Sequence, residues 1–480
     1  MAPTQGRHRG QVRREGPLGV PTVSTTSIPG LLVVSLDVHG DDRGWFKENW
    51  QREKLVALGL PDFGPVQQNI SYNAAAGVTR GIHAEPWDKL VSIVTGRAFG
   101  AWVDLREGPG FGAVFTHELD PHTAVFVPRG VGNSYQVLED ATAYSYLVNR
   151  HWRPDAGYKE LNLADPTAAV PWPIALDDAS VERSAKDLAN PELGDVEPFA
   201  PAPALVVGHR GQLGRALLRA LPHADGVDID ELDLTDPTAV AAFDFSGYDV
   251  VVNAAAYTAV DRAETDEGRL ACWAGNATAP ATLARLASEH GFTLVHVSSD
   301  YVFDGTRRPH TEDEPLAPLS VYGQAKAAGD LAVAATPRHY LLRTTWLIGE
   351  GHNFVRTMAK LADDGVSPTV VDDQVGRLTF TDDLARGIAH LLEVRAPYGT
   401  YNLTNTGRVR SWREFAADVF EARGRSRDDV APTTTAEYAD GREPFAPRPL
   451  LSEMSLDKLL ATGFEPRDVD EALADYLRRS

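Results

Sequence analysis

A tyrosine and a lysine stand four residues apart in the segment VYGQAKAAGD, as Tyr322 and Lys326. Residues at this spacing share one face of a helix, which makes the phenol and the ammonium group neighbours. Ser298 and Ser299 follow the apolar run TLVHV, at the edge where parallel sheets bind ligands. This set suits ketone reduction: Tyr322 gives a proton to the carbonyl oxygen as hydride reaches its carbon, while Lys326 lowers the pKa of the phenol and holds the ribose of a nicotinamide cofactor.

The segment GHRGQLG is a candidate loop for binding that dinucleotide. It follows the apolar run ALVV, and Gly208, Gly211 and Gly214 permit a tight turn, a close approach to pyrophosphate and close packing of helix on strand. Asp228 stands twenty residues after Gly208, where a ribose hydroxyl needs an acceptor. Arg210 lies within the loop, where it can meet a 2'-phosphate, so NADH and NADPH both remain open.

A second group of reactive side chains stands in RGIHAEPWDK, which holds Arg80, His83 and Lys89. His83 is a candidate base because imidazole titrates near neutral pH. Small β-barrels often bind iron or zinc with a His-x-His pair, but the sequence here reads HAE, and Asn133 stands where a further histidine would complete a site. We therefore predict metal-free chemistry. Other polar residues of strand-like segments are Arg43, Glu48, Gln67, Asn69 and Tyr146.

The elements that must position these groups change along the chain. Residues 30–150 contain short β-branched and aromatic runs between Gly and Pro turns, which predicts an all-β sandwich or barrel. From Ala204, apolar strands alternate with helical segments, which predicts a parallel sheet covered on both faces. The stretch ELGDVEPFAPAPA is rich in proline and predicts a linker. We expect a flexible tail at 1–25, a β domain at 26–176, a linker at 177–203 and an α/β domain at 204–480.

Composition limits the class of partner. A formal net charge of -21 opposes nucleic acid and anionic membranes, although a small anionic substrate can still bind in a basic pocket. Cys272 is the only cysteine, which excludes an internal disulfide framework and fits a reducing cytoplasm. No apolar run approaches the about 20 residues of a spanning helix. The N-terminal segment lacks the apolar core of a secretory signal, and an organellar presequence is the alternative to a tail.

In the C-terminal half, the motifs GQLG, ELDLTD, NAAAYTAVDRAE, HVSSDYVFDG, YGQAK, RTTW, NF and DQVG occur in order. Together they closely resemble the dTDP-4-dehydrorhamnose reductases, extended short-chain dehydrogenases with a Rossmann fold and a small substrate-binding part. The resemblance covers residues 204–480. It implies that Ser299 replaces the family's catalytic threonine, with Tyr322 as proton donor and Lys326 as its modulator.

The same resemblance implies binding roles for other positions. The cofactor would be lined by Gly208, Arg210, Gly211, Gln212, Leu213, Gly214, Asp228, Asp233, Leu234, Ala254, Ala255, Asn276, Tyr322 and Lys326. The sugar nucleotide would be approached by Val260, Tyr301 and Trp346. The segment DQVGRLTF departs from the family pattern, which bears on the substrate loop near Arg377.

In the N-terminal half, DDRGWFKE, QQN, RGIH, KLV, FVPRG and DPTAAVPWP resemble the dTDP-4-dehydrorhamnose 3,5-epimerases, which are cupin jelly rolls. The resemblance implies that His83 removes protons next to the C4 ketone and that Asp165 orients it. Lys89 would stabilise the enolate oxygen, and Tyr146 would return a proton on the opposite ring face. The nucleotide and its diphosphate would be bound by Arg43, Glu48, Gln67, Asn69 and Arg80.

Two departures from the epimerase pattern lie near the sugar. Glu85 replaces the family's glutamine, and Asn133 replaces its histidine. They bear on whether one carbon or two are inverted.

The two resemblances imply consecutive steps: 3,5-epimerisation of dTDP-4-dehydro-6-deoxy-glucose, then NADPH- or NADH-dependent reduction to dTDP-L-rhamnose, a precursor of cell wall polysaccharide. One alternative is a mono-epimerase and reductase that makes another dTDP-6-deoxysugar. The other is a non-catalytic, dinucleotide-binding regulatory subunit. The cupin resemblance also implies a homodimer formed through exposed strands.

Overall fold

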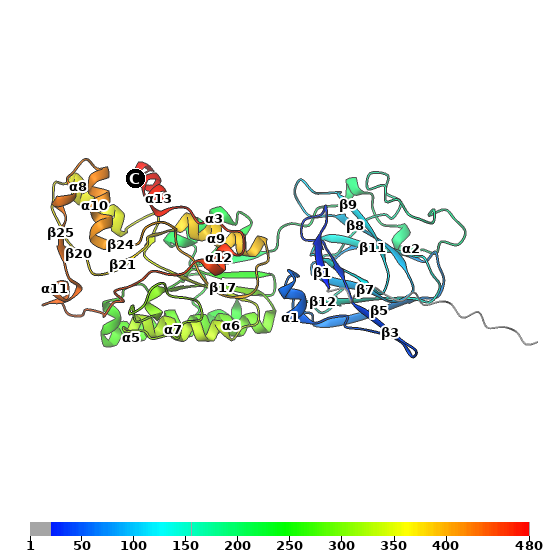
Figure 1. The fold of residues 1–480 in the computed structure, drawn as a ribbon, viewed down its shortest axis with the longest axis horizontal. Helices are drawn as coiled ribbons and strands as arrows, with labels where there is room; N and C mark the ends of the chain where they lie inside the picture. The colour runs from blue at the N-terminus through cyan, green and yellow to red at the C-terminus, as the bar shows by residue number, and fades with distance from the viewer. Residues whose placement is uncertain (1–20, 155, 480) are drawn as a thin grey trace, which may run out of the picture. The chain divides into compact units, whose positions relative to one another are not determined.

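The chain folds as two units, divided after Ala200 (Figure 1). The computed structural model describes residues 21–154 and 156–479. Residues 1–20 of the expected tail lie outside the described residues. The rest of the tail prediction is wrong, because Thr22–Thr25 forms strand β1, which pairs antiparallel with β2 (Leu32–Ser35). The β-branched residues of TVST favour this strand.

Two antiparallel sheets make up the first unit. One has the strand order β1, β2, β10 (Thr123–Val127), β7 (Lys89–Thr95), β12 (Thr142–Val148) and β5 (Gln67–Asn73). The other has the order β13 (Lys159–Glu160), β6 (Thr79–Ala84), β11 (Val131–Val137), β8 (Ala98–Asp104) and β9 (Val114–Leu119). Val91, Trp102 and Val125 belong to the buried core that both sheets share. This sandwich confirms the predicted all-β jelly roll.

A hairpin and a short helix lie outside these sheets. The hairpin pairs β3 (Val38–Asp41) with β4 (Gly44–Lys47), and Figure 1 shows β3 projecting beyond β5. Helix α1 (Arg52–Ala57) follows it.

The segment expected to be a linker, residues 177–203, belongs mostly to the first unit. It contains helix α2 (Ala185–Leu188) and the 3-10 turn η1 (Leu193–Asp195). The side chains of Leu193, Val196 and Phe199 are buried in a core that they share with β6 and β8. The linker prediction is therefore wrong up to residue 200. Prolines break the periodicity there, but the apolar side chains between them still enter the core.

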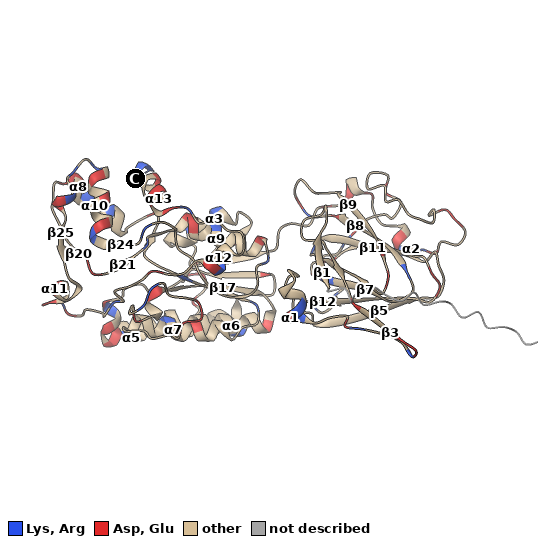
Figure 2. Cartoon of the chain, viewed as in Figure 1, with Lys and Arg blue, Asp and Glu red and all other residues tan. Residues whose placement is uncertain are grey.

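A six-stranded parallel sheet forms the centre of the second unit. Its order is β15 (Ala224–Val227), β14 (Ala204–Val207), β16 (Val250–Asn253), β17 (Thr293–Ser299), β18 (His339–Thr344) and β23 (Gly399–Asn402). Helices α3 (Gln212–Ala220) and α9 (Thr381–Glu393) cover one face, and α4 (Pro237–Ala242), α6 (Ala279–His290) and α7 (Val321–Ala334) cover the other. Charged residues lie mainly on the helices and loops around this sheet (Figure 2).

This arrangement confirms the predicted parallel sheet covered on both faces. Its strand order reverses between β14 and β16, the position where doubly wound sheets bind dinucleotides.

A smaller C-terminal part packs around α8 (Phe354–Asp363), α10 (Trp412–Ala422) and α13 (Val469–Arg479). Its short strands pair as β19 (Leu347–Ile348) with β22 (Thr379–Phe380), β20 (Thr369–Val371) with β25 (Ala431–Thr433), and β21 (Val375–Gly376) with β24 (Arg410–Ser411). The remaining elements of the second unit are η2 (Arg262–Glu264), α5 (Asp266–Trp273), η3 (Ala274–Thr278), η4 (Asp300–Val302), η5 (Arg427–Asp429), α11 (Thr435–Ala439) and α12 (Asp457–Leu460). Within residues 21–154 and 156–479, the helices are too short or too polar to cross a bilayer.

Candidate active sites

A cavity of about 470 Å³ lies in the first unit, between strands of both sheets and the segment that carries α2. Four of the residues predicted from sequence line it: Arg80, His83, Lys89 and Tyr146. Glu85 and Asn133, the two departures from the family pattern, line it as well. The cavity is therefore the candidate active site of this unit.

His83 projects from β6 and is oriented by a residue of α2. Its Nε2 lies 2.8 Å from Oδ1 of Asp187, whose side chain is only 6% exposed. Ser184 caps α2 and accepts a hydrogen bond from the backbone N–H of Asp187, which fixes this carboxylate at the start of the helix. A buried carboxylate that bonds one imidazole nitrogen sets the ring's orientation.

The prediction that Asp165 orients His83 is wrong. The Asp165 carboxylate instead accepts hydrogen bonds from the backbone N–H groups of Thr167, Ala168 and Leu193. These bonds attach the chain before α2 and the chain after it to one buried side chain, and Asp165 is 3% exposed. Its role is to hold the segment that carries Asp187.

Lys89 and Glu85 form an ion pair on the cavity wall, with Nζ and Oε1 2.7 Å apart. The ammonium group also lies 5.2 Å from the ring centroid of Tyr146 on β12. Burial raises the pKa of the Tyr146 phenol, and the charge of Glu85 adds to the rise. Tyr146 is therefore protonated at neutral pH and able to donate a proton, beside a cation suited to an enolate.

Asn133 is held by neighbours in the core. Its Oδ1 accepts hydrogen bonds from Nε1 of Trp102 and from the hydroxyl of Tyr144, both 3.0 Å long. The described residues contain no group of three His, Cys, Asp or Glu side chains arranged to hold a metal ion.

Among the residues predicted to bind the nucleotide, Arg80 lines the cavity and the others lie elsewhere. Arg43, at the tip of the β3–β4 hairpin, is 90% exposed in its side chain and pairs with Asp41. Glu48 pairs with Lys54. Gln67 and Asn69 bond each other on β5.

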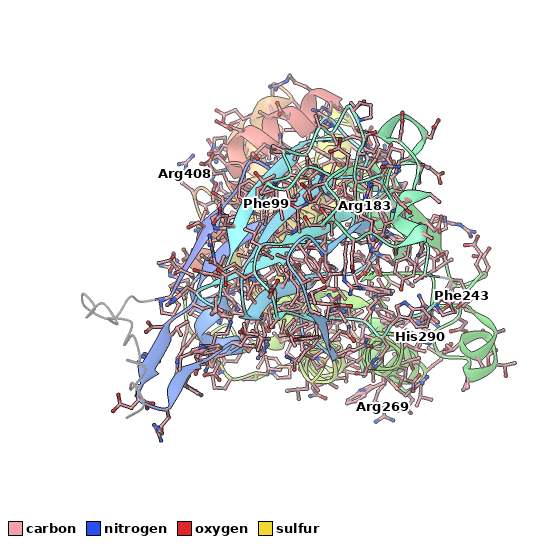
Figure 3. The ribbon with its side chains drawn as sticks, turned by 90° about the vertical axis from the view of Figure 1, so that its right-hand side faces the viewer. Phe99, Arg183, Phe243, Arg269, His290 and Arg408 are labelled. Carbon is pink, nitrogen blue, oxygen red and sulfur yellow. The ribbon has the colours of Figure 1, made fainter. Side chains whose placement is uncertain are left out.

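Sequence reasoning missed the part of the cavity wall that comes from the supposed linker: Glu182, Arg183, Ser184, Lys186 and Asp187. Figure 3 labels Arg183, which lies on the segment before α2. One signal was available, because Ser184 followed by Asp187 has the S-x-x-D spacing of a helix start.

In the second unit, the glycine loop lies at the reversal of the sheet. Gly208 directly follows β14 with φ +80°, and a Cβ there would lie 2.7 Å from the backbone nitrogen of Ala255, beyond β16. A Cβ on Gly214 would lie 2.2 Å from the carbonyl oxygen of Gly208. Among the described residues, no side chain caps α3, so its first N–H groups are free for an anion. The loop therefore fits the pyrophosphate of a dinucleotide.

Five other predicted cofactor residues lie at the start of α3 or directly after β16, beside this loop. Gly211, Gln212 and Leu213 start α3, and Ala254 and Ala255 follow β16. Leu234 is buried and Asp233 caps a turn through Thr235.

Asp228 and Arg210 lie close together, at the end of the glycine loop where the ribose of the dinucleotide is expected. Oδ2 of Asp228 accepts a hydrogen bond of 3.1 Å from the backbone N–H of Arg210. The Arg210 guanidinium pairs with Asp230 and Glu231, and it is about half exposed. Both groups therefore lie where they can meet a ribose hydroxyl or a phosphate on it.

Asn276 lies in η3, a π-helical turn between α5 and α6. Its side chain bonds both backbone groups of Tyr257, in the loop after β16, at 3.0 Å each. Single π-helical turns often occur at functional sites. The sequence around Asn276 contains no signal that predicts this π-helical turn.

Ser299, Tyr322 and Lys326 gather at the carboxyl edge of the sheet. Ser299 ends β17, while Tyr322 and Lys326 lie in the first turns of α7, which Ser320 caps. Nζ of Lys326 donates a 3.1 Å hydrogen bond to the carbonyl oxygen of Val297. Lys326 is 2% exposed and Tyr322 8%.

The protonation states suit donation of a proton. Burial, followed by the neighbouring Tyr301, raises the pKa of the Tyr322 phenol, and Ser299 opposes the rise. The phenol is therefore protonated at neutral pH. Burial lowers the pKa of Lys326 to about 8, so the side chain is an ammonium group at pH 7.

Of the predicted sugar-binding residues, Val260 and Tyr301 pack against Tyr322. The rings of Tyr301 and Tyr322 meet edge to face, 5.3 Å apart. Trp346 instead stacks on Trp412 of the C-terminal part, with centroids 3.8 Å apart.

The loop around DQVGRLTF is held by hydrogen bonds of its own Arg377. The guanidinium donates to the backbone of Gly407 and Met454 and pairs with Glu453. Sequence reasoning missed Arg448, which donates two hydrogen bonds to Asp261 near Val260. It also missed Asp300, which accepts hydrogen bonds from Ser299 and Ser452.

A doubly wound sheet with a glycine loop at its reversal and a Ser, Tyr and Lys set at its edge defines the second unit as a dinucleotide-dependent oxidoreductase of the short-chain type. Residues 203–480 match the family model described as RmlD substrate binding domain, and residues 25–195 match the model described as dTDP-4-dehydrorhamnose 3,5-epimerase. The chain therefore belongs to the RmlD family, and its first unit belongs to the dTDP-4-dehydrorhamnose 3,5-epimerase family.

Individual relatives agree with both matches. The chain is 46% identical over 181 residues to "Protein RmlC homolog" of Streptococcus pyogenes serotype M6, covering 36% of this chain and 90% of the relative. It is 42% identical over 283 residues to a probable dTDP-4,6-dihydroxy-2-methyloxan-3-one 4-ketoreductase of Streptomyces antibioticus, covering 56% of this chain and 93% of the relative. A solved dTDP-4-dehydrorhamnose reductase of Bacillus anthracis, in complex with NADP, is 30% identical with a TM-score of 0.53, covering 59% of this chain and 100% of its own.

Proposed function

We propose that the protein is a bifunctional enzyme of dTDP-L-rhamnose biosynthesis. Its first unit epimerises dTDP-4-dehydro-6-deoxy-glucose at C3 and C5, and its second unit reduces the C4 ketone of the product. The pairing of an epimerase family with a reductase family in one chain carries this proposal, because the two reactions are consecutive.

In the first unit, His83 takes a proton from the carbon next to the ketone, and Asp187 stabilises the imidazolium that forms. Lys89 stabilises the negative charge on the enolate oxygen. Tyr146 returns a proton to the carbon, and its raised pKa keeps that proton available. We expect the base and the acid to act on opposite faces of the sugar ring, which inverts the carbon.

In the second unit, the glycine loop and α3 hold a nicotinamide dinucleotide, NADPH or NADH, which supplies hydride when bound. Tyr322 gives its proton to the ketone oxygen, and Ser299 orients that oxygen by hydrogen bonding. Lys326, held by Val297, stabilises the tyrosinate that remains and binds the nicotinamide ribose. The NADP in the Bacillus anthracis relative supports the phosphorylated cofactor, and Asp228 supports NADH.

The direct test supplies dTDP-4-dehydro-6-deoxy-glucose with NADPH or NADH in D2O. Absorbance follows the reduction, and NMR of the product identifies the sugar and the labelled carbons. We expect dTDP-L-rhamnose with deuterium at C3 and C5. Label at one carbon only would defeat the double epimerisation.

A second candidate function is a mono-epimerase and reductase that makes another dTDP-6-deoxysugar. Glu85, which pairs with Lys89, and Asn133 favour it, since both differ from the family pattern inside the cavity. The Streptomyces antibioticus relative is named for a different ketosugar, which also favours it. The same NMR experiment separates the two candidates.

We also propose a homodimer formed through the jelly roll and a cytoplasmic location. Large apolar side chains are exposed on the hairpin and on edge strand β5: Phe46 is 69%, Ile70 61% and Tyr72 63% exposed. The single buried cysteine, which forms no disulfide, fits a reducing compartment. Light scattering after size exclusion measures the mass; a monomer at micromolar concentration would contradict the dimer.

A further inference from the structure

Helix α7 carries a buried charge that the mechanism above does not use, Asp330. It is 1% exposed, and its Oδ2 lies 3.1 Å from Nε of Arg343 on β18. Arg343 is buried too; it donates to the backbone of Glu312 and lies over the ring of Phe303. A buried ion pair is weak evidence for stability, because both charges lose their hydration. Stability alone therefore does not explain why Asp330 of this ion pair lies one helical turn after Lys326.

Asp330 lies four residues after Lys326, on the same face of α7. Ser298 on β17 and Arg343 on β18 are partners in the sheet register. Burial raises the pKa of the Asp330 carboxyl, and Arg343 is the first influence that lowers it. The residue before Ser298, Val297, accepts the hydrogen bond of Lys326. The ammonium group thus meets β17 next to Ser298, whose partner in the sheet, Arg343, pairs with Asp330.

The surroundings of Lys326 give Asp330 an electrostatic role. Burial is the main influence on Lys326 and lowers its pKa to about 8; Asp330 is the first influence that raises it, followed by Cys272 of α5. Tyr322 on α7 is a protonated phenol. His296 on β17 is neutral, because burial lowers its pKa far below the ordinary value. Asp330 is therefore the carboxylate that favours the ammonium form from within the core.

We propose that Asp330 is a positioning residue for the reduction. It acts through Lys326, keeping that side chain an ammonium group during turnover. This inference rests on the proposed function of the second unit. Asp330 itself is buried and paired with Arg343, so it does not act on the substrate.

The test compares three full-length variants with the unchanged chain. Asp330→Asn removes the charge, Asp330→Glu keeps it, and Asp364→Asn is a matched control on α8. Asp364 also follows a lysine, Lys360, by four residues, but that pair is exposed. Two readouts are recorded across neutral and alkaline pH: the rate of ketone reduction, and the affinity for the reduced dinucleotide by fluorescence without any sugar.

In the unchanged chain, both readouts should fall as the pH rises through about 8. With Asp330→Asn, both midpoints should move to lower pH by about one unit, because the nearby opposite charge is gone. Asp330→Glu and Asp364→Asn should keep the midpoint of the unchanged chain. A merely structural role for Asp330 would lower the melting temperature without moving either midpoint.

Unchanged midpoints in Asp330→Asn would overturn the inference, as would an equal shift in Asp330→Glu. If Asp330→Asn fails to fold because Arg343 is left unpaired, the double variant Asp330→Asn with Arg343→Gln makes the same comparison. Its midpoints must also shift downward, or the inference is wrong. A chain that binds the dinucleotide with this pH dependence and yet reduces no ketone would contradict the proposed function, and it would still show that Asp330 acts on Lys326.

Discussion

In the jelly roll, the reacting groups lie on the wall of an open cavity, and the His83 side chain is 35% exposed. In the reductase unit, Lys326 is 2% exposed, and the ion pair of Asp330 with Arg343 lies in the core behind it. Water competes for every contact in the open site, so its chemistry depends on pairs held at hydrogen-bond distance. Tyr322 and Lys326 of the reductase site are buried, so their chemistry depends on how burial shifts each protonation state.

Tyr322→Phe should have the largest effect, because it should slow the reaction of one site and leave that of the other unchanged. Ketone reduction should fall by about 10²- to 10⁴-fold, because no other group replaces the phenol proton. Deuterium uptake at C3 and C5 should stay at the level of the unchanged chain, which serves as the internal control. Reduction at an unchanged rate would show that Tyr322 is not the proton donor, whereas no reduction even in the unchanged chain would favour a regulatory, dinucleotide-binding subunit.

Asp187→Asn should strongly slow the epimerisation in the jelly roll. Uptake of deuterium should fall by about 10²-fold or more, because the imidazolium of His83 loses its carboxylate. Asp165→Asn is the matched comparison: uptake should remain within a few-fold, while thermal unfolding shows a loss of about 1–3 kcal/mol from weakened bonds to buried N–H groups. The reverse ranking would restore Asp165 as the orienting residue.

Raising the pH should separate the two reactions. The ammonium form of Lys326 is lost as the pH rises through about 8, so reduction should fall by roughly tenfold per unit above that value. The pKa of Tyr146 is raised, so its proton is retained over the same range. Both rates are measurable in one sample by absorbance and NMR. A parallel decline of the two would contradict the contrast between the sites.

Arg210→Ala should have the smallest effect. The kcat/KM for NADPH should fall several-fold while that for NADH changes little, since an exposed guanidinium contributes modestly to binding a phosphate. Arg219→Ala, which removes an exposed guanidinium of α3 paired with Glu350 and Asp382, is the control. An equal loss of kcat/KM for the two cofactors would show that Arg210 does not bind the 2'-phosphate.

The reductase site could be predicted from sequence because its parts are local. Tyr322 and Lys326 share one helix, and Gly208 and Ser299 directly follow or end strands whose apolar runs are plain. The jelly roll could be predicted as a class, but the hydrogen-bonded pair in its candidate active site could not. His83 and Asp187 are 104 residues apart and meet only through the fold. Nothing in the proline-rich composition distinguishes a packed segment from a free linker.

The position of α2 limits where this chain can be cut. A protein ended at residue 176 would keep His83, Lys89 and Tyr146, but it would lack Asp187 and the buried side chains of Leu193, Val196 and Phe199. Such a fragment would expose apolar surface and precipitate more readily than one ended after Ala200. Gene shuffling that exchanges either enzyme for a relative should therefore place its junction at residues 200–203.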